Sequence, residues 1–397
     1  MLTLDKIYHA SYVLKGHIRY TDLIHSADIC PGTDLYLKTE NLQVTGAFKI
    51  RGAFYKISQL SEEEKSRGVI ACSAGNHAQG VALASTRNGI KSLICLPDGA
   101  PISKVEATKK YGAQVKLVDG TYDDAYEEAL RLYEKEGYTF IHPFDDEDVI
   151  AGQGTIGLEI LEQLPDVECV IVPIGGGGLI SGVAMAVKKL NPNVKVYGVQ
   201  ASGAPSMQKA IAQGKKITLE TVSTIADGIA VKTPGDLTYE LCSKYVDEIV
   251  TVTDDEISSA ILTLIEQQKL ITEGAGAVAV AAAMFHKVPI EGKKTVCLLS
   301  GGNIDVNILS RVIKRGLLKS GRTYALNIEL IDKPGQLKGV SSVIAETGAN
   351  VIAIHHERAD ANSDINGCYL RVVMETRNYE HIEQVRNALK NAGYKIS

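Results

Sequence analysis

Residues 170–182 read VIVPIGGGGLISG, an apolar run that ends in four consecutive glycines and a helix-like segment. A continuous apolar run is typical of a strand that is buried on both faces of a sheet. Four glycines in a row cost considerable chain entropy, so they are expected where the backbone wraps closely around an anion at a helix start. The stretch therefore predicts a buried strand, a turn that cradles a phosphate, and a helix.

The same alternation continues on both sides, from about residue 35 to residue 319. Further short apolar runs occur at residues 69–72, 92–96, 115–118, 194–199 and 296–299. The segments between them have helical spacing, as in residues 123–136, where Ala125, Ala129 and Tyr133 fall on one side. Alternating strands and helices predict an α/β fold with a largely parallel sheet, in which ligands bind at the carboxyl ends of the strands.

Length and composition limit the class of protein. A chain of 397 residues exceeds one ordinary core, so two or three units are expected. The net charge of −5 and the scattered Lys and Arg residues give no electrostatic footprint for nucleic acid. The most apolar stretch, residues 274–285, is shorter than the ~20 residues that span a bilayer, so it predicts a buried helix and no membrane partner.

The seven cysteines contain no C-x-x-C pair, and several of them sit inside the apolar runs. This pattern is typical of buried free thiols in a reducing cytosol. The N-terminus lacks the basic start and apolar core of a signal peptide. We therefore expect a cytoplasmic protein, and we predict no metal ligands.

The pattern changes near residue 320, and a small separate unit is predicted beyond it. A half-buried strand is expected at residues 324–330, because apolar residues alternate there with polar or small ones. Two further strands are expected at residues 350–357 and 369–374. A turn at residues 332–335 leads into a helix, residues 360–367 form a polar loop, and residues 379–392 form a second helix. The order β-α-β-β-α, with a last short strand, predicts a ferredoxin-like βαββαβ unit.

Lys49 is the first candidate for chemistry, within residues 41–53, NLQVTGAFKIRGA. An apolar, small-residue setting removes water from an amine and lowers its pKa, which suits a lysine to form a Schiff base. For an isolated lysine, an exposed position on the first turn of a helix is favoured by roughly ten to one. The hypothesis that Lys49 forms a Schiff base is therefore supported only in combination with the other motifs of the chain.

Two further loops follow predicted strands. Residues 73–80, SAGNHAQG, are expected to begin a helix whose N–H groups favour an anion. The same sequence is also compatible with an ordinary N-cap and a purely structural role for His77. Residues 300–303, SGGN, place Ser300 where its hydroxyl can face a ring nitrogen. The four glycines at residues 175–178 do not form a G-x-G-x-x-G motif followed by a suitably placed acidic residue. This disfavours a nicotinamide cofactor and a Rossmann-type dehydrogenase.

In order and placement these motifs resemble the fold type II pyridoxal-phosphate (PLP) enzymes, most closely the threonine ammonia-lyases, over essentially the whole chain. The resemblance implies a catalytic domain at residues 1–320, built from two open, twisted, mostly parallel α/β subdomains. The smaller subdomain, at about residues 52–145, would be inserted in the larger one. Residues 332–337, DKPGQL, and 348–351, GANV, resemble an ACT regulatory domain at residues 321–397.

The resemblance also implies roles for single residues. Lys49 would hold PLP and then move the substrate's α-proton. The residues implied in cofactor binding are Phe48, Lys49, Asn76, Gly175, Gly176, Gly177, Gly178, Leu179 and Ser300. The residues implied around the substrate carboxylate are Ser73, Ala74, Gly75, Asn76 and His77. A serine at the ring nitrogen makes the cofactor a weaker electron sink than an aspartate would, which suits β-elimination.

The implied reaction converts L-threonine to 2-oxobutanoate and ammonia, and L-serine to pyruvate. A serine-preferring dehydratase stays open, because one methyl group changes discrimination by only about 1–3 kcal/mol. Racemases of the family have a serine where Ala74 stands and a metal-binding glutamate where Gln200 stands, so racemisation and that metal site are disfavoured. Lys49 likewise disfavours a non-catalytic amino-acid sensor.

The ACT resemblance implies regulation and assembly. Such domains usually pair side by side and bind small effectors at the interface, so a homo-oligomer, dimer or tetramer, is expected. The effector is left open between an amino acid such as isoleucine and a nucleotide, and a tail that makes only a dimer contact is the minority alternative.

Overall fold

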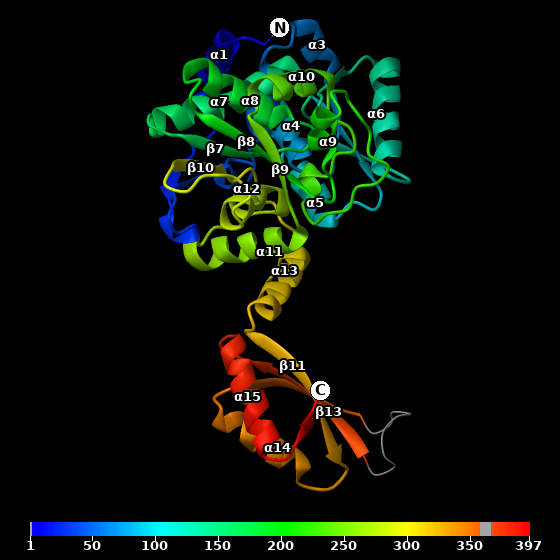
Figure 1. Cartoon of the computed structure of the whole chain (residues 1–397). Coiled ribbons are helices and arrows are strands. Elements are labelled where there is room, and N and C mark those ends of the chain that lie inside the picture. The colour runs from blue at the N-terminus through cyan, green and yellow to red at the C-terminus, as the bar shows by residue number, and fades with distance from the viewer. Residues whose placement is uncertain (1, 358–366) are drawn as a thin grey trace. The chain divides into compact units, whose positions relative to one another are not determined.

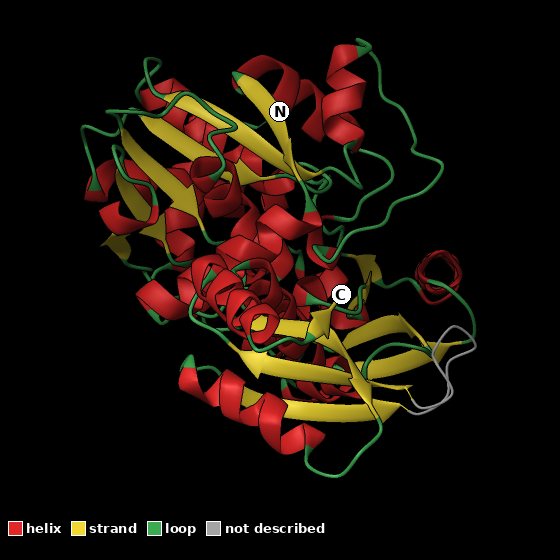
Figure 2. Ribbon diagram, turned by 60° about the horizontal axis from the view of Figure 1, so that its bottom comes forward, coloured by secondary structure: helices red, strands yellow, loops and turns green. Residues whose placement is uncertain are grey.

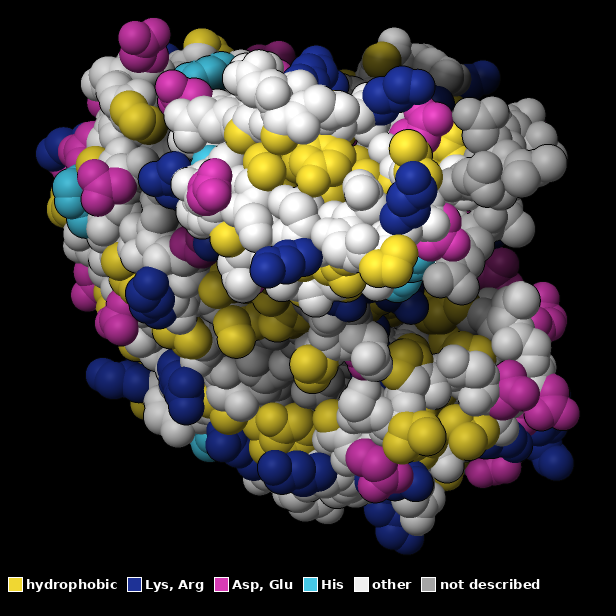
Figure 3. All heavy atoms as spheres, turned by 90° about the horizontal axis from the view of Figure 1, so that it is seen from below, with side chains coloured by type: hydrophobic (Ala, Val, Ile, Leu, Met, Phe, Trp, Pro, Cys, Tyr) yellow, Lys and Arg dark blue, Asp and Glu magenta, His cyan; other side chains and the backbone are white. Residues whose placement is uncertain are grey.

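The computed structural model describes residues 2–357 and 367–397, and it divides the chain into two compact units, Met1–Val306 and Asn307–Ser397 (Figure 1). The predicted polar loop at residues 360–367 therefore lies outside the described residues, except for Gly367. Among the described helices, none is long and apolar enough to cross a membrane. On the face drawn in Figure 3, the described acidic and basic side chains are intermixed.

The first unit contains a larger sheet of six strands in the order β1-β2-β10-β7-β8-β9. Its strands are β1 (Leu23–His25), β2 (Asp34–Lys38), β7 (Cys169–Pro173), β8 (Lys195–Ala201), β9 (Glu248–Val252) and β10 (Lys294–Leu298). Only β1 pairs antiparallel; the other neighbours are parallel. Strand β10, late in the unit, lies between β2 and β7, so the loops after these three strands meet at one edge.

A smaller sheet of four parallel strands has the order β5-β4-β3-β6. Its strands are β3 (Val69–Cys72), β4 (Ser92–Pro97), β5 (Gln114–Val118) and β6 (Thr139–Phe140). The predicted α/β class with mostly parallel sheets is confirmed. The prediction that residues 115–118 are buried on both faces is wrong: β5 is an edge strand, and Leu117 is 51% exposed.

Helices cover these sheets, and their ends follow local sequence signals. The helices of the first unit are α1 (Leu4–Leu14), α2 (Lys49–Ser58), α3 (Glu62–Arg67), α4 (Asn76–Arg87), α5 (Ile102–Lys110), α6 (Tyr122–Glu136), α7 (Glu147–Gln163), α8 (Gly178–Leu190), α9 (Ser206–Ala212), α10 (Asp236–Tyr245), α11 (Asp254–Thr263) and α12 (Gly274–Met284). Thr121 and Asp124 form a capping box at the start of α6, and left-handed Gly137 ends it. Helix α12 is buried, as predicted.

The second unit begins with α13 (Val306–Lys319), most of which belongs to it, and continues as a four-stranded antiparallel sheet in the order β12-β13-β11-β14. Its elements are β11 (Thr323–Ile331), α14 (Gln336–Glu346), β12 (Asn350–Glu357), β13 (Gly367–Glu375), α15 (Tyr379–Asn391) and β14 (Lys395–Ile396). Figure 2 shows the strands of this unit as one sheet. The predicted βαββαβ order, including the short last strand, is confirmed.

A buried charge cluster, defined here as Lys38, Glu40, Arg51 and Glu159, fixes α2 to β2 and α7. The Arg51 guanidinium donates to both carboxylate oxygens of Glu40, at 2.7 and 2.8 Å, and to Glu159 Oε1 at 2.5 Å. Lys38 Nζ donates to Glu159 Oε2 at 2.6 Å. All four residues are at most 7% exposed. Because Arg51 lies two residues after Lys49, the cluster holds the helix whose first residue is that lysine.

Candidate active site

The loops that carry the predicted site residues follow parallel strands. Residues 174–178 follow β7, Ser300 follows β10, and residues 39–48 follow β2, so the larger sheet brings these three loops to one edge. Residues 73–75 follow β3 of the smaller sheet and lead directly into α4. Helix α4 packs closely on α2, since a Cβ at Gly80 would lie 3.2 Å from the carbonyl oxygen of Lys49. Both sheets thus contribute loops around the start of α2.

Lys49 is the first residue of α2, and its side chain is half-buried. Its Nζ donates a hydrogen bond to the Pro143 carbonyl oxygen at 2.6 Å and lies 5.3 Å from the centre of the Phe48 ring. The surrounding protein removes water from the amine, which lowers the pKa of Lys49 to about 8, although the negative charge of Glu273 acts in the opposite direction. With this pKa, roughly a tenth of the amine is neutral at pH 7.

The four glycines are packed too closely for side chains. A Cβ at Gly176 would lie 2.5 Å from Phe144 ring atoms, and a Cβ at Gly178 would lie 2.7 Å from the Phe144 carbonyl oxygen. Gly177 has a φ of 99°, and the Thr238 hydroxyl donates to the Gly176 carbonyl at 2.6 Å. Because Phe144 directly follows the carbonyl that accepts from Lys49, the glycine turn lies next to the lysine.

Ser300 and Phe48 are joined through the backbone. The Phe48 N–H donates to the Ser300 carbonyl oxygen at 3.1 Å, and Ala47 forms an antiparallel bridge with Gly301. The Ser300 side chain is buried, and its hydroxyl donates to the Ala275 carbonyl at 3.2 Å. The structure thus brings Ser300 beside the residue that precedes Lys49.

The loop before α4 is open on one side. Ser73, Ala74, Gly75 and Asn76 are all half-buried, and the Ser73 hydroxyl accepts from the Gly75 N–H at 3.1 Å. This leaves the loop accessible to a small ligand at the start of a twelve-residue helix, where backbone N–H groups favour an anion.

His77 is buried, and its Nε2 lies 2.8 Å from the Ile141 carbonyl oxygen. Burial, reinforced by the positive charge of Lys49, lowers the pKa of His77 to about 3. The ring is therefore neutral and donates its proton to that carbonyl, which fixes the tautomer. His77 links the start of α4 to the segment just before Pro143.

Gln200, at which the family resemblance disfavours a metal site, is fully buried in the larger sheet. Its amide oxygen accepts from the Gln208 N–H at 2.9 Å, and its amide nitrogen donates to the Ile174 carbonyl at 3.4 Å. The oxygen and the nitrogen of this side-chain amide therefore both form hydrogen bonds with the backbone.

Glu273 is a site residue that the sequence did not reveal. It is 6% exposed, and it accepts from Asn76 Nδ2 at 2.7 Å, while Asn303 Nδ2 donates to Asn76 Oδ1 at 2.8 Å. Burial, followed by the charge of Asp227, raises the pKa of Glu273 to about 7. An acidic residue directly before the apolar run of α12 was the only local sign of it.

We expect the Glu273→Gln variant to lose an inflection near pH 7 in the pH profile of kcat/KM. The raised pKa means that Glu273 is mostly protonated below pH 7 and charged above it, so the charge-assisted bond to Asn76 forms only as the pH rises. The wild-type kcat/KM should therefore increase through pH 7. In the variant a neutral hydrogen bond replaces the charge-assisted bond to Asn76. This change should lower kcat/KM about tenfold above pH 7.

The matched variant for this experiment is Asp227→Asn. Asp227 raises the pKa of Glu273 through its charge and lies exposed, in an ion pair with Lys104 Nζ at 2.7 Å. Removing the charge should move the inflection to lower pH without abolishing it. An inflection that is unchanged in both variants would show that another group titrates.

The chain is similar to several known proteins. The model of the pyridoxal-phosphate dependent enzyme family matches residues 14–301, and that of the ACT domain matches residues 324–393. The chain is 51% identical over 398 residues to an L-threonine ammonia-lyase of Thermotoga maritima, covering 100% of this chain and 99% of the relative. It is 48% identical over 316 residues to the catabolic L-threonine dehydratase of Escherichia coli K12, covering 78% of this chain and 96% of the relative. The solved structure of processed threonine deaminase isoform 2 from Solanum lycopersicum matches with a TM-score of 0.75 and 40% identity, covering 79% of this chain and 87% of that one.

Proposed function

Since the chain belongs to the pyridoxal-phosphate-dependent L-threonine ammonia-lyases with a C-terminal ACT domain, we propose that it converts L-threonine to 2-oxobutanoate and ammonia, and L-serine to pyruvate at the same site. The observation that carries the proposal is the position of Lys49. Its amine has a lowered pKa and donates to Pro143, next to the residue that packs on the glycine turn.

The residues present fit a phosphorylated pyridine cofactor. The first N–H groups of α8 have no partner inside the helix, and they start at Gly178 and Leu179, directly after a turn with no side chains. Lys49 would hold the cofactor covalently, with Phe48 beside its ring. Asn76 would reach the ring hydroxyl, and Ser300 the ring nitrogen. When bound, the cofactor withdraws electrons from the substrate's α-carbon.

The chain's own groups would then perform the elimination. The loop at residues 73–77 would bind the substrate carboxylate through backbone N–H groups, which orients the α-hydrogen. The neutral amine of Lys49 would take the α-proton, and passing that proton to the departing β-hydroxyl would let it leave as water. Hydrolysis of the released enamine yields the 2-oxo acid and ammonia, so the water lost is returned.

Serine is included because it has a hydrogen where threonine has a methyl group, so it fits in a pocket that accepts threonine. That difference changes discrimination by only about 1–3 kcal/mol, so a serine-preferring enzyme is the alternative. Ala74 has no hydroxyl to deliver a proton to the opposite face, which argues against racemisation.

The test is the visible spectrum of the purified protein and its response to L-threonine, with 2-oxo acid release followed in parallel. We expect an absorption band that changes on addition of threonine, and release of 2-oxobutanoate. The ratio of kcat/KM for threonine and serine separates the two preferences. A protein that shows no responsive band and no 2-oxo acid would contradict the proposal.

We assign catalysis to residues 1–320, with a smaller subdomain at about residues 52–145, and allosteric control of a homo-oligomer to residues 321–397. The ACT match and the separate core of the second unit support this assignment. The seven buried free cysteines support a cytoplasmic location.

Ending the chain after Ser320 should remove the response to effectors and keep basal turnover, because the pyridoxal-phosphate dependent enzyme model ends at residue 301 and the ACT model begins at residue 324. L-isoleucine and a panel of nucleotides are added to the full and shortened proteins, and the change in initial rate is compared. If the shortened protein responds as the full protein does, the regulatory assignment is wrong.

A further inference from the structure

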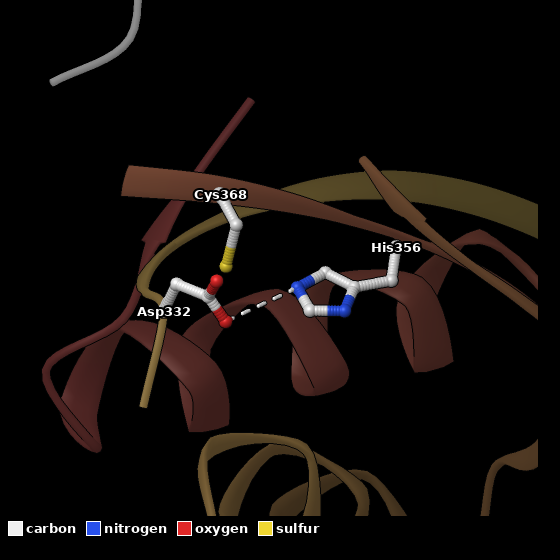
Figure 4. Close-up of side chains that lie close together, drawn as sticks. All are labelled: Asp332, His356 and Cys368. Carbon is white, nitrogen blue, oxygen red and sulfur yellow. Dashed lines mark ion pairs between the residues drawn. The ribbon is translucent and has the colours of Figure 1, made fainter. Parts of the chain in front are cut away.

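Three side chains with metal-binding donors converge at one end of the sheet in the second unit. Asp332 follows β11, His356 lies near the end of β12, and Cys368 is the second residue of β13. One donor atom from each lies within 4.8 Å of the other two. Figure 4 shows the carboxylate, the imidazole and the thiol pointing toward one another. Among residues 2–357 and 367–397, this is the one group of three or more His, Cys, Asp or Glu side chains that meets this distance.

The strand register explains why the three meet. Leu330 pairs with Cys368, and His356 pairs with Leu370. Alternation along strands therefore puts these four side chains on one face of the sheet, the face whose leucines lie in the core under the helices. Asp332 comes two residues after Leu330 and continues the same face beyond the strand end. The cluster thus combines side chains of β12 and β13 with the residue that follows β11.

The donor set is one that transition metals prefer. A thiolate, an imidazole and a carboxylate together suit Zn²⁺, with bonds of about 2.0–2.3 Å that imply donor separations of about 3.3–3.6 Å in a tetrahedral site. His356 Nε2 and Asp332 Oδ1 are 4.0 Å apart, so a closure of less than an ångström is needed between them. Their side chains are 41% and 38% exposed and can rotate, whereas Cys368 is buried.

We propose that the C-terminal unit binds one divalent transition-metal ion, with Zn²⁺ favoured by the donors, through Asp332, His356 and Cys368. Binding removes the thiol proton of Cys368, so one proton is released for each ion bound. Three protein ligands leave a fourth position, which faces solvent because two of the ligands are exposed, for water or a small molecule with a donor atom. The bound ion ties the ends of β11, β12 and β13 together beside the turn into α14.

The other cysteines offer a contrast within the same chain. The six cysteines before residue 306 are buried in the first unit, and burial raises the pKa of Cys72 and Cys242 to about 12. In the described residues none of these six thiols belongs to a group of the kind formed around Cys368. A metal-dependent thiolate signal therefore has one expected source.

The experiment is a titration of the full-length, chelator-treated protein with Co²⁺, followed by difference absorption spectroscopy and by proton release. We expect one ion per chain and a thiolate-to-cobalt charge-transfer band, which Zn²⁺ then abolishes by competition. His356→Ala and Cys368→Ser should each remove the band and weaken affinity at least as much as the roughly 10- to 100-fold typical of outer-shell losses. Far-UV circular dichroism checks that both variants are folded.

His355→Ala is the matched control. His355 is the adjacent exposed residue of β12 and points to the opposite face of the sheet, so it should bind Co²⁺ as the wild type does. The absence of a charge-transfer band in the wild-type protein overturns the proposal. So does a band that persists in both the His356 and the Cys368 variants, since the ion would then sit elsewhere.

Discussion

Replacing Lys49 with alanine will reduce turnover of L-threonine by about 10²- to 10⁴-fold or more, because the variant lacks the amine that would hold the cofactor and move the α-proton. The half-buried amine of Lys49 lies beside the glycine turn, with a pKa lowered to about 8. The measurement is the initial rate of 2-oxobutanoate release at saturating cofactor. The visible absorption band that responds to threonine should vanish together with activity.

Lys56→Ala is the control for this variant. Lys56 lies on the same helix, α2, but pairs with Asp146 and Asp148 at 2.8 and 3.2 Å. Its loss should change stability slightly and leave the absorption band in place. If Lys49→Ala turns over threonine at a rate close to that of Lys56→Ala, the role given to Lys49 is wrong.

Replacing Glu159 with alanine will lower the free energy of unfolding by about 3–5 kcal/mol, because it removes one of two carboxylates from the buried charge cluster. Lys38 and Arg51 would then share Glu40 alone, although both cations are fully buried. The expected result is a lower midpoint of urea denaturation, which is monitored by far-UV circular dichroism. Activity should fall as well, since the cluster holds the helix that begins at Lys49.

Glu162→Ala is the matched control, since Glu162 lies on the same helix, α7, and contacts only the exposed Tyr20 hydroxyl, at 3.1 Å, among the bonds described. Its effect should be within about 0.5 kcal/mol, as for ordinary surface changes. Equal midpoints for the two variants would show that the cluster does not stabilise the fold.

The buried charge cluster also sets a pH dependence. Burial by itself would raise the pKa of Glu40, but the charge and hydrogen bonds of Arg51 outweigh it and hold that pKa below its usual value. A carboxyl with a lowered pKa stabilises the fold above its unfolded-state pKa of about 4.3. This contribution is lost as the pH falls through the lower, folded-state pKa.

Local patterns in the sequence were enough to predict six of the ten strands described in the first unit, the alternation of strands and helices there, and the βαββαβ order of the second unit. Apolar runs are caused by burial of strands, and alternation is caused by half-burial, so both the parallel sheets and the βαββαβ unit could be predicted. The glycine turn, the loop before α4 and Ser300 were found for the same reason: each directly follows a predicted strand. Their assigned roles rested on a family resemblance and stay predictions.

Strand order was decided only by the tertiary structure. Strand β10 lies late in the chain yet pairs with β2 and β7, and this places Ser300 beside Phe48. Strand β5 lies at an edge, which exposes Leu117 despite an apolar run that indicates burial.

The sequence by itself was enough to predict Lys49 as a candidate site residue, the glycine turn at residues 175–178 and a separate C-terminal unit. Each of these features has a recognisable pattern within a few neighbouring residues. Only the tertiary structure decided which charged and metal-binding side chains meet. Glu273 beside Asn76, the pairing of Arg51 with Glu40 and Glu159, and the meeting of Asp332, His356 and Cys368 all join distant segments. Burial of a charge depends on partners that strand pairing and helix packing supply, and no local pattern records them.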